Sequence, residues 1–347
     1  MCGIIGVFAN EDIDLNKFIE MRDELKHRGP DDEGVYLNQS GNIALGHRRL
    51  SIIDLSPNGK QPMSNEDKTI WITFNGEIYN YQKLKDYLIK QGHKFKTNTD
   101  TEVIIHGYEE WEYDVLNKIN GMFAFGILDE NKNELFLARD RLGIKPLYYY
   151  FKNKKLIFAS EVKGIIKDTE IKRIINLKAL KYYFLFGYIP NPYSIWEDIY
   201  KLPPGKYLLF KNGKISIKKY WDINNNSIYK NEKSIIKKIK KLFSSSIKYR
   251  LISDVPVGVL LSGGLDSSLV SAFTARIKKE IITFSIGFKP ENISELNDAK
   301  FIANYLGVKN VNNILSKNNI DKFLDKLLYF YDEPFGISSI EINSFSF

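Results

Sequence analysis

The sequence predicts two parts, an α+β sandwich followed by a parallel, doubly wound α/β domain. Short strand-like apolar stretches separated by turns dominate residues 1–165, a pattern typical of an antiparallel sheet with helices beside it. From residue 232 onward, helix-like and strand-like stretches alternate, as they do in parallel sheets. The polar, asparagine-rich residues 222–233 separate the two patterns. We therefore expect domains at 2–221 and 232–347, joined by a linker at 222–231.

In the first part, strands are expected where β-branched and aromatic residues dominate, and helices where apolar residues recur every three or four positions. The expected strands are residues 3–8, 43–54 (as two strands or one bent strand), 69–74, 123–128, 134–138, 147–151 and 156–160, and the expected helices are 15–25, 81–91 and 102–111. Residues 27–34 are rich in Gly, Pro and Asp and are expected to form a loop.

In the second part, the expected helices are residues 232–250, 266–278, 295–306 and 320–331, and the expected strands are 255–261, 281–288 and 308–314. The densest lysine run lies at 230–241, where its spacing predicts an amphipathic helix with a solvated face. The formal net charge is +8, but no recognised nucleic-acid-binding motif accompanies the basic residues. We expect no nucleic-acid partner.

The sequence also indicates a compartment. A single cysteine excludes an intramolecular disulfide framework and suits a reducing environment. No run of about 18 apolar residues is present, so no membrane span is expected. The apolar residues at the start lack a basic flank and are followed by Glu11 and Asp12, unlike a signal peptide. We expect a cytoplasmic protein that does not associate with membranes.

Cys2 is the only cysteine and lies one residue from the start of the chain. If Met1 is removed, Cys2 carries both a thiol and a free α-amine. An ordinary thiol, with a pKa of about 8.5, is mostly protonated at pH 7, so a nucleophilic cysteine needs a base. An α-amine with a pKa of about 7.7–8.0 can be that base. Cys2 is therefore a candidate nucleophile, and a lone cysteine at a strand end is the alternative.

Two further groups of residues could bind a substrate. Arg49, beside Arg48, lies among apolar strand residues and needs an anionic partner, which could be a structural carboxylate or the carboxylate of a ligand. The Asn75 amide and the Gly76 N–H could form two donors for an oxyanion. The Asn75-Gly76 dipeptide is also a strong turn signal, so a simple hairpin turn is the alternative.

A glycine- and serine-rich loop follows the strand expected at 255–261 and leads into a helix. In an α/β sheet this position binds ligands, and a helix N-terminus attracts anions. The loop lacks the lysine of a Walker motif, so it suits a pyrophosphate group held by backbone and hydroxyl groups, with Mg²⁺ as counter-charge. The candidate residues are Ser262, Gly263, Gly264, Asp266 (also a metal ligand), Ser267 and Ser268. An ordinary β-α turn is the alternative.

Taken together, the motifs resemble those of glutamine-hydrolysing asparagine synthetases of the B type. The resemblance covers residues 2 to about 336. It is carried, in chain order, by Cys2, His27-Arg28-Gly29-Pro30-Asp31, Arg49-Leu50-Ser51-Ile52, Asn75-Gly76-Glu77-Ile78-Tyr79-Asn80, Asp100-Thr101-Glu102, Arg139-Asp140 with Gly143, and residues 262–268. It implies an N-terminal-nucleophile hydrolase sandwich (αββα) that releases ammonia from glutamine, followed by an ATP-pyrophosphatase domain.

The resemblance also implies roles for individual residues. Cys2 would attack the glutamine amide with its own α-amine as base, while Asn75 and the Gly76 N–H would form the oxyanion hole. Arg49 would hold the glutamine α-carboxylate, and Asp100, with Glu77, the α-ammonium group. The loop at 262–268 would bind ATP, with Ile286 and Gly287 at the end of the next strand beside the nucleotide. Aspartate would be adenylated and then aminated, and a homodimer is compatible with the resemblance.

The resemblance stops before the end of the chain. Residues 337–347 do not match the segments that follow in this family, so we expect a complete glutaminase site, an incomplete synthetase half and little or no asparagine formation. Two other functions stay open at this point. One is an amidotransferase that acts on another carboxylate, such as a sugar acid in surface polysaccharide synthesis. The other is an inactive remnant that docks with another chain or aggregates.

Overall fold

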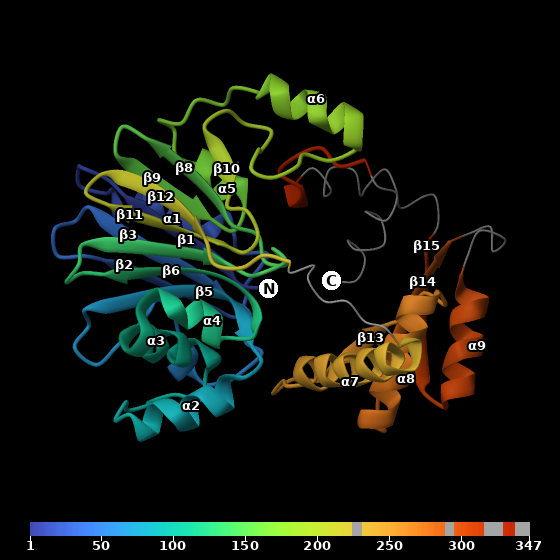
Figure 1. Ribbon diagram of the computed structural model, residues 1–347. Helices are drawn as coiled ribbons and strands as arrows, with labels where there is room; N and C mark the ends of the chain where they lie inside the picture. The colour runs from blue at the N-terminus through green and yellow to red at the C-terminus, as the bar shows by residue number, and fades with distance from the viewer. Residues whose placement is uncertain (224–230, 289–294, 316–328, 337–347) are drawn as a thin grey trace. The chain divides into compact units, whose positions relative to one another are not determined.

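The computed structural model describes residues 1–223, 231–288, 295–315 and 329–336 (Figure 1). The chain divides into two compact units. The first consists of Met1–Asn224 together with Asp332–Gly336, and the second of Asn225–Tyr331 with Ile337–Phe347. Residues 332–336 thus pack on the first unit although they come late in the chain.

Two six-stranded antiparallel sheets stack in the first unit (Figure 1). The first sheet has the strand order β10-β8-β9-β1-β3-β2, and the second has the order β12-β11-β7-β6-β5-β4. Helices α1 and α5 pack on the first sheet, and α3 packs on the second. The layers therefore run helix, sheet, sheet, helix, which confirms the expected αββα sandwich.

The strands of the first unit are β1 (Gly3–Phe8), β2 (Asp32–Leu37), β3 (Ile43–Arg49), β4 (Met63–Ser64), β5 (Ile70–Ile78), β6 (Gly121–Asp129), β7 (Glu134–Arg139), β8 (Tyr148–Lys152), β9 (Lys155–Ala159), β10 (Ile199–Lys201), β11 (Lys206–Lys211) and β12 (Lys214–Lys219). Its helices are α1 (Leu15–Asp23), α2 (Tyr81–Lys90), α3 (Asp100–Trp111), α4 (Val115–Lys118), α5 (Val162–Ile166) and α6 (Leu177–Phe186). Most of these elements agree with the sequence-based expectations to within a few residues.

Three expectations in this unit were wrong. The strand expected at 69–74 is longer than predicted, because β5 continues through Asn75-Gly76, where a hairpin turn was the alternative, and stays paired with β6 as far as Ile78. The loop expected at 27–34 ends earlier, since β2 begins at Asp32 and pairs with β3. The strand expected at 43–54 ends at Arg49, and the chain then turns, with Asp54 at a φ of 57°. In each case pairing with a neighbouring strand, or its loss, outweighs local residue preference.

Phe158 fills the space between the two sheets. Its ring belongs to β9, and glycines approach it from β1 in the same sheet and from β6 in the other. A Cβ at Gly6 would lie 2.3 Å from the ring, and a Cβ at Gly126 would lie 2.7 Å from it. The two glycines therefore make room for one large aromatic side chain, which sets the spacing of the sheets beside the first strand of the chain.

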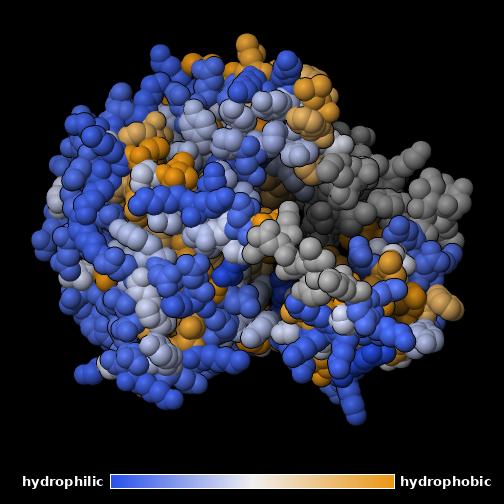
Figure 2. Space-filling model, viewed as in Figure 1, coloured by the Kyte–Doolittle hydropathy of each residue, from blue (hydrophilic) through white to orange (hydrophobic). Residues whose placement is uncertain are grey.

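Helix α6 differs from the other helices of the first unit because much of its surface is apolar and exposed. Figure 2 shows hydrophobic residues at α6 on an otherwise largely hydrophilic surface. Ala179 is buried in a small cluster with Ile189 and Ile195, while Phe184 and Leu177 are about three-quarters exposed, at 77% and 75%. The side of α6 that carries Ala179 thus packs on the unit, whereas the side that carries Leu177 and Phe184 is exposed to solvent.

The second unit contains a parallel sheet with the order β13-β14-β15, as expected from the alternation of elements. Its described elements are α7 (Glu232–Arg250), β13 (Gly258–Leu260), α8 (Leu265–Ile277), β14 (Ile282–Phe288), α9 (Leu296–Leu306) and β15 (Lys309–Leu315). The strand expected at 255–261 is shorter than predicted and begins after Pro256, which has no N–H for a ladder. Most of the helix expected at 320–331, most of the linker and all of residues 337–347 lie outside the described residues. Among the helices of the described residues, none combines the length and hydropathy needed to cross a bilayer.

We predict that Gly6→Ala lowers the free energy of unfolding of the first unit by about 1–3 kcal/mol, because the added methyl group overpacks the Phe158 ring. Urea unfolding followed by tryptophan fluorescence measures the effect. The matched test repeats Gly6→Ala in a Phe158→Leu background, where the smaller side chain should relieve much of the penalty. An equal penalty in both backgrounds would contradict this packing argument.

Candidate active site

Cys2 lies immediately before β1, at the start of a central strand of the first sheet. This strand pairs with β3 on one side and β9 on the other, and Ser160 also binds the backbone of Ile4. The Cys2 sulfur lies 3.4 Å from the Leu50 nitrogen, which donates to it, and 3.6 Å from the Leu50 oxygen. The position of the thiol is therefore fixed by the turn that follows β3.

The surroundings of Cys2 act on its thiol in opposite directions. Burial raises the pKa of the thiol, whereas the Leu50 N–H, the N-terminal amine and Lys145 act to lower it. The amine itself, carried here by Met1, has its pKa lowered by burial to about 6. An amine in this environment is an unprotonated base at neutral pH, which is the chemistry that a buried, protonated thiol requires.

Arg28 secures the backbone of Cys2. Its Nε donates to the Cys2 carbonyl at 2.9 Å, and its Nη1 donates to Glu161 at 2.6 Å. The absence of a side chain at Gly29 lets the chain after Arg28 pass close to β3, because a Cβ at Gly29 would lie 2.3 Å from the backbone of Arg48. Although burial raises the pKa of Glu161, His27, Arg28 and Lys163 together lower it to about 2. Arg28 thus has a permanently charged partner.

The same ion-pair network reaches residues late in the chain. Lys163 contacts Glu161 and lies 3.1 Å from Asp332, whose other oxygen accepts the Lys163 backbone N–H at 3.2 Å. Lys201 pairs with Glu333. Burial raises the pKa of both acidic groups, Asp332 and Glu333. Sequence reasoning gave no signal for Glu161 or for these pairings, because they join segments far apart in the chain.

Arg48 and Arg49 have different partners: Arg48 forms ion pairs with carboxylates, and Arg49 donates hydrogen bonds to backbone carbonyls. Arg48 has the structural carboxylates that the sequence left open, Glu33 and, at 3.7 Å, Asp23. Arg49 is buried and makes no ion pair within the described part of the chain. Its guanidinium donates instead to backbone carbonyls, including that of Ser56 at 2.9 Å. Carbonyl groups do not neutralise its charge, so Arg49 can still take a carboxylate.

Asn75 and Gly76 lie in the middle of β5. Asn75 is 1% exposed, and neither atom of its amide has a hydrogen-bond partner among the described residues. The carbonyl oxygen of the preceding residue, Phe74, accepts a hydrogen bond from His47 Nε2 of β3 at 3.0 Å, and His47 pairs with Ile4 of β1. Through His47, the part of β5 that carries Asn75 is therefore linked to β1, the strand that follows Cys2. A buried, unpaired amide is costly, so its presence points to a ligand.

Asp100 opens helix α3 beside β5. One of its oxygens accepts the Ile78 N–H at 2.7 Å. Burial, with the charge of Glu77 as a smaller cause, raises its pKa to about 7 against the opposing effect of the Ile78 N–H. The charge of Asp100 also acts on the Cys2 thiol. Two carboxylates held near each other and near the thiol suit a cationic group of a ligand.

Lys145 is a buried charged residue near Cys2 that sequence reasoning missed. It is buried, at 6% exposure, and its charge interacts with Glu77, Arg28 and Cys2. Its backbone is held by Asp140, whose carboxylate accepts the Lys145 N–H at 3.0 Å. Burial lowers the pKa of Lys145. The neighbouring Arg139-Asp140 was noticed in the sequence, but nothing there indicated that the lysine turns inward.

In the second unit, the glycine- and serine-rich loop joins β13 to α8. Ser262 and Ser267 bind each other at 3.0 Å, so these hydroxyls brace the loop. Gly263 has a φ of 90°, and a Cβ there would lie 2.7 Å from Asp298. The cap residue Gly264 offers no side chain to the first turn of α8. The loop therefore presents an uncapped helix start, with Asp266 exposed in the first turn.

The other residues predicted to bind ATP are Ser268, in the first turn of α8, and Ile286 and Gly287, near the end of β14. The Ser268 hydroxyl is buried without a partner among the described residues. The parallel pairing of β13 with β14 ends at Leu260 and Phe284, so Ile286 and Gly287 lie beyond the last residue of β13. This is the carboxyl end of the strands, where such sheets bind ligands.

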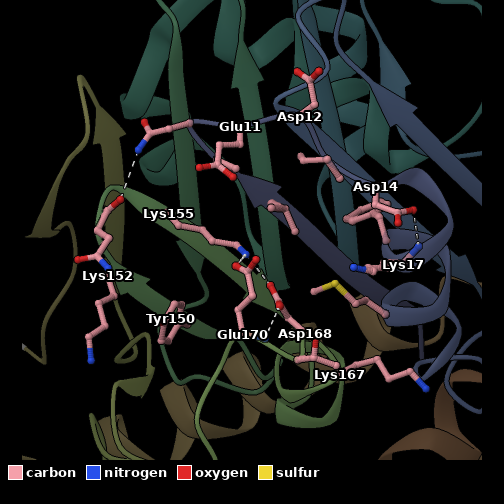
Figure 3. A pocket seen from close by; sticks show the side chains of 18 of the residues that line it. Glu11, Asp12, Asp14, Lys17, Tyr150, Lys152, Lys155, Lys167, Asp168 and Glu170 are labelled. Atoms are coloured by element: carbon pink, nitrogen blue, oxygen red, sulfur yellow. Dashed lines mark hydrogen bonds and ion pairs between the residues drawn. The ribbon is translucent and has the colours of Figure 1, made fainter.

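One hollow of the described surface lies away from Cys2. It has a volume of about 850 Å³ and is lined by the far end of β1, by α1 and by residues near β8 and β9 (Figure 3). Lys155 crosses it and pairs with Asp168 and Glu170, both at 2.7 Å. Since β1 runs from Gly3 to Phe8, the hollow and the thiol lie at opposite ends of this strand. None of the predicted site residues lines it.

We predict a pH-dependent effect for Asp100→Asn. Because burial raises the pKa of this carboxyl, the folded state binds the proton more tightly than the unfolded state. The carboxyl therefore destabilises the fold as the pH rises from about 4 toward 7. Asp100→Asn should raise the free energy of unfolding on the order of 2 kcal/mol at pH 8 and have little effect near pH 4. Urea unfolding at both values measures this.

Asp86→Asn serves as the matched control, because Asp86 is exposed on α2. It should change stability little at either pH. A destabilised Asp100→Asn variant at pH 8 would contradict the assignment of a costly buried carboxyl.

The chain matches two protein families. Residues 1–221 match the glutamine amidotransferase domain, and residues 238–343 match asparagine synthase. Among solved structures, the glutamine phosphoribosylpyrophosphate amidotransferase of B. subtilis, complexed with ADP and GMP, aligns with a TM-score of 0.50 at 18% identity, covering 89% of this chain and 65% of that one. At this identity the likeness speaks for the fold alone.

Curated relatives extend the match along the chain. A putative glutamine-hydrolysing asparagine synthetase 2 of Methanocaldococcus jannaschii is 41% identical over 97% of this chain and 69% of its own length. Asparagine synthetase 1 of Bacillus subtilis is 37% identical over 96% of this chain and 53% of its own length. The chain thus spans between half and about two-thirds of these relatives. It belongs to the family of glutamine-hydrolysing asparagine synthetases.

Proposed function

We propose that this chain uses glutamine as an ammonia source for the ATP-dependent amidation of aspartate to asparagine. The first unit would release ammonia at Cys2, and the second would bind ATP at the loop before α8. Family membership supports the reaction, and the buried, unpaired amide of Asn75 is the single observation that supports the glutaminase site most directly. This amide is satisfied only when a ligand atom reaches it.

The nucleophile would be the thiol of Cys2 after removal of Met1. The α-amine of Cys2 takes the thiol proton, and the sulfur attacks the side-chain amide carbon of glutamine. The carbon–nitrogen bond then breaks, the nitrogen takes the proton from the α-ammonium group, and ammonia leaves. Water cleaves the resulting thioester to give glutamate and restore the thiol. An ordinary α-amine, with a pKa of about 7.7–8.0, is sufficiently unprotonated near neutral pH to act as this base.

The ends of glutamine would be held by groups of opposite charge. Arg49, buried and without an ion-pair partner in the described part of the chain, would bind the α-carboxylate. Asp100 and Glu77 would bind the α-ammonium group, which would also hold Asp100 in its ionised form. We assign Lys145 no contact with glutamine, although its charge favours the thiolate form of Cys2.

In the second unit, ATP phosphates would lie at the uncapped start of α8. The backbone of Gly263 and Gly264 and the hydroxyls of Ser262, Ser267 and Ser268 line this start, with Ile286 and Gly287 beyond the end of β13. The exposed carboxylate of Asp266 and the loop hydroxyls are oxygen donors, the type that Mg²⁺ prefers. A bound Mg²⁺ would offset the phosphate charge, and Asp266 would be its protein ligand.

The function is tested with glutamine labelled with ¹⁵N in its side-chain amide. The full chain, with removal of Met1 verified by mass spectrometry, is incubated with this glutamine, aspartate, ATP and Mg²⁺. Labelled asparagine is the expected product of the complete reaction. Labelled ammonia without labelled asparagine would limit the activity to the first unit and refute the proposed amidation of aspartate. No glutamate release would refute the glutaminase assignment.

We predict that Asn75→Ala lowers kcat for glutamate release by about 10²–10³-fold, because it removes one oxyanion donor. Stability should be unchanged or slightly higher, since the amide makes no hydrogen bond among the described residues. Steady-state kinetics and urea unfolding measure the two effects. The nearby Asn65→Ala is the matched control: its amide binds Glu109 at 2.9 Å, so it should lose stability but keep kcat. A strongly destabilised Asn75→Ala variant would contradict the proposed role.

A further inference from the structure

A second cluster of titratable side chains lies on the outer helical layer of the first unit. It consists of His106 and Glu109, one turn apart on α3, and His93 in the loop after α2. One ligand atom from each of the three lies within 4.8 Å of the others. The two imidazole rings are 5.1 Å apart. None of these residues takes part in the site at Cys2.

The inner atoms of the cluster converge on one carboxylate oxygen. Glu109 Oε2 lies 2.7 Å from His106 Nδ1 and 3.3 Å from His93 Nδ1. Two nitrogens and one oxygen thus surround a common point. Spacing of i and i+3 on a helix places His106 and Glu109 on one face, so the backbone itself maintains half of this arrangement.

The outer atoms of the same three side chains are also held. Glu109 Oε1 accepts from Asn65 at 2.9 Å, and His93 Nε2 lies 3.3 Å from Glu110. His106 Nε2 faces Glu102 at 3.8 Å. Metal-binding histidines characteristically direct their second nitrogen to a carboxylate, which fixes the ring and its tautomer. Both histidines here direct that nitrogen toward a carboxylate, although the distance from His106 to Glu102 is longer than a hydrogen bond.

The electrostatics of the cluster favour added positive charge. His106 is 2% exposed, and its Nε2 has no hydrogen-bond partner in the described part of the chain. Three carboxylates lie close to its ring: Glu109 Oε2 is 2.7 Å from Nδ1, and Glu102 and Glu66 lie 3.8 and 4.0 Å from Nε2. A divalent cation would offset part of this negative charge.

We propose that His93, His106 and Glu109 bind a divalent transition-metal ion such as Zn²⁺. Two imidazole nitrogens and a carboxylate oxygen are a donor set that Zn²⁺ accepts, with water in the fourth position. The side chains of His93 and Glu109 are 17% and 22% exposed, so an ion can reach them. Donor atoms around a tetrahedral Zn²⁺ lie about 3.3 Å apart. His106 Nδ1 and Glu109 Oε2, now 2.7 Å apart, must therefore move slightly apart when the ion binds.

A metal at this position would fasten the loop after α2 to α3. The same loop precedes Asp100, the first residue of α3, and Glu102 holds it through the backbone nitrogens of Lys96 and Thr97, at 2.7 and 2.8 Å. The ion would therefore stabilise the helix start that carries a residue of the candidate active site. This inference does not depend on the proposed function.

The test uses the full chain without an affinity tag and with Cys2→Ser, which removes the thiol as a competing ligand. Metal-free protein is titrated with Zn²⁺ at pH 7.5 against a chromophoric chelator, and the Co²⁺ form is examined by visible absorption. We expect one Zn²⁺ per chain. His93→Gln and Glu109→Gln should each bind at least tenfold more weakly, and Glu110→Gln, an outer partner, about tenfold more weakly.

His27→Gln is the matched control, because His27 binds Glu161 elsewhere in the first unit. It should bind Zn²⁺ like the parent. Melting curves of the metal-free variants separate loss of metal from loss of fold, and His93 is chosen because it is only partly buried. No Zn²⁺ uptake, or equal affinity in His93→Gln and His27→Gln, would overturn the proposal and leave the cluster as an ion-pair network.

Discussion

The hydrogen bond from Arg28 to the Cys2 carbonyl is the contact on which the candidate active site depends. A free chain end would fray, and β1 alone cannot fix a residue that precedes it. The buried guanidinium provides that anchor and is itself neutralised by Glu161. A buried arginine without its carboxylate would be strongly destabilising, on the order of 3–5 kcal/mol. The backbone of the nucleophile is therefore held by Arg28 and, through Arg28, by Glu161, which lies between β9 and α5.

Several groups at the site are held in states that cost the fold free energy. The thiol of Cys2 and the carboxyl of Asp100 are buried and unfavourable in their charged forms, and the Asn75 amide is unpaired among the described residues. Such features concentrate at functional sites, because a ligand restores the missing interactions. The sandwich can carry these costs because the space between its sheets is filled by continuous apolar packing.

The sequence was informative where a single element decides the outcome. Period and composition predicted β1, α1, α3 and the alternation in the second unit. The motifs also predicted Cys2, Arg49 and Asp100 as site residues, and that assignment stays a prediction. It was less informative where partners far apart in the chain decide. The path of β5 through Asn75-Gly76 depends on β6, and the inward position of Lys145 depends on Asp140. Helix α6 and strands β10 to β12 had no clear pattern because their faces are mixed in polarity.

The return of Asp332–Gly336 to the first unit makes a loop of the chain between them. Residues 225–331 leave the first unit after Asn224 and rejoin it where Lys163 and Lys201 hold Asp332 and Glu333. Closing both ends of a segment lowers the conformational entropy of its unfolded state and so favours its folded state. Because thermodynamic linkage acts in both directions, folding of the second unit would also favour these charge pairs. Folding of the second unit and charge pairing on the first are thus thermodynamically linked.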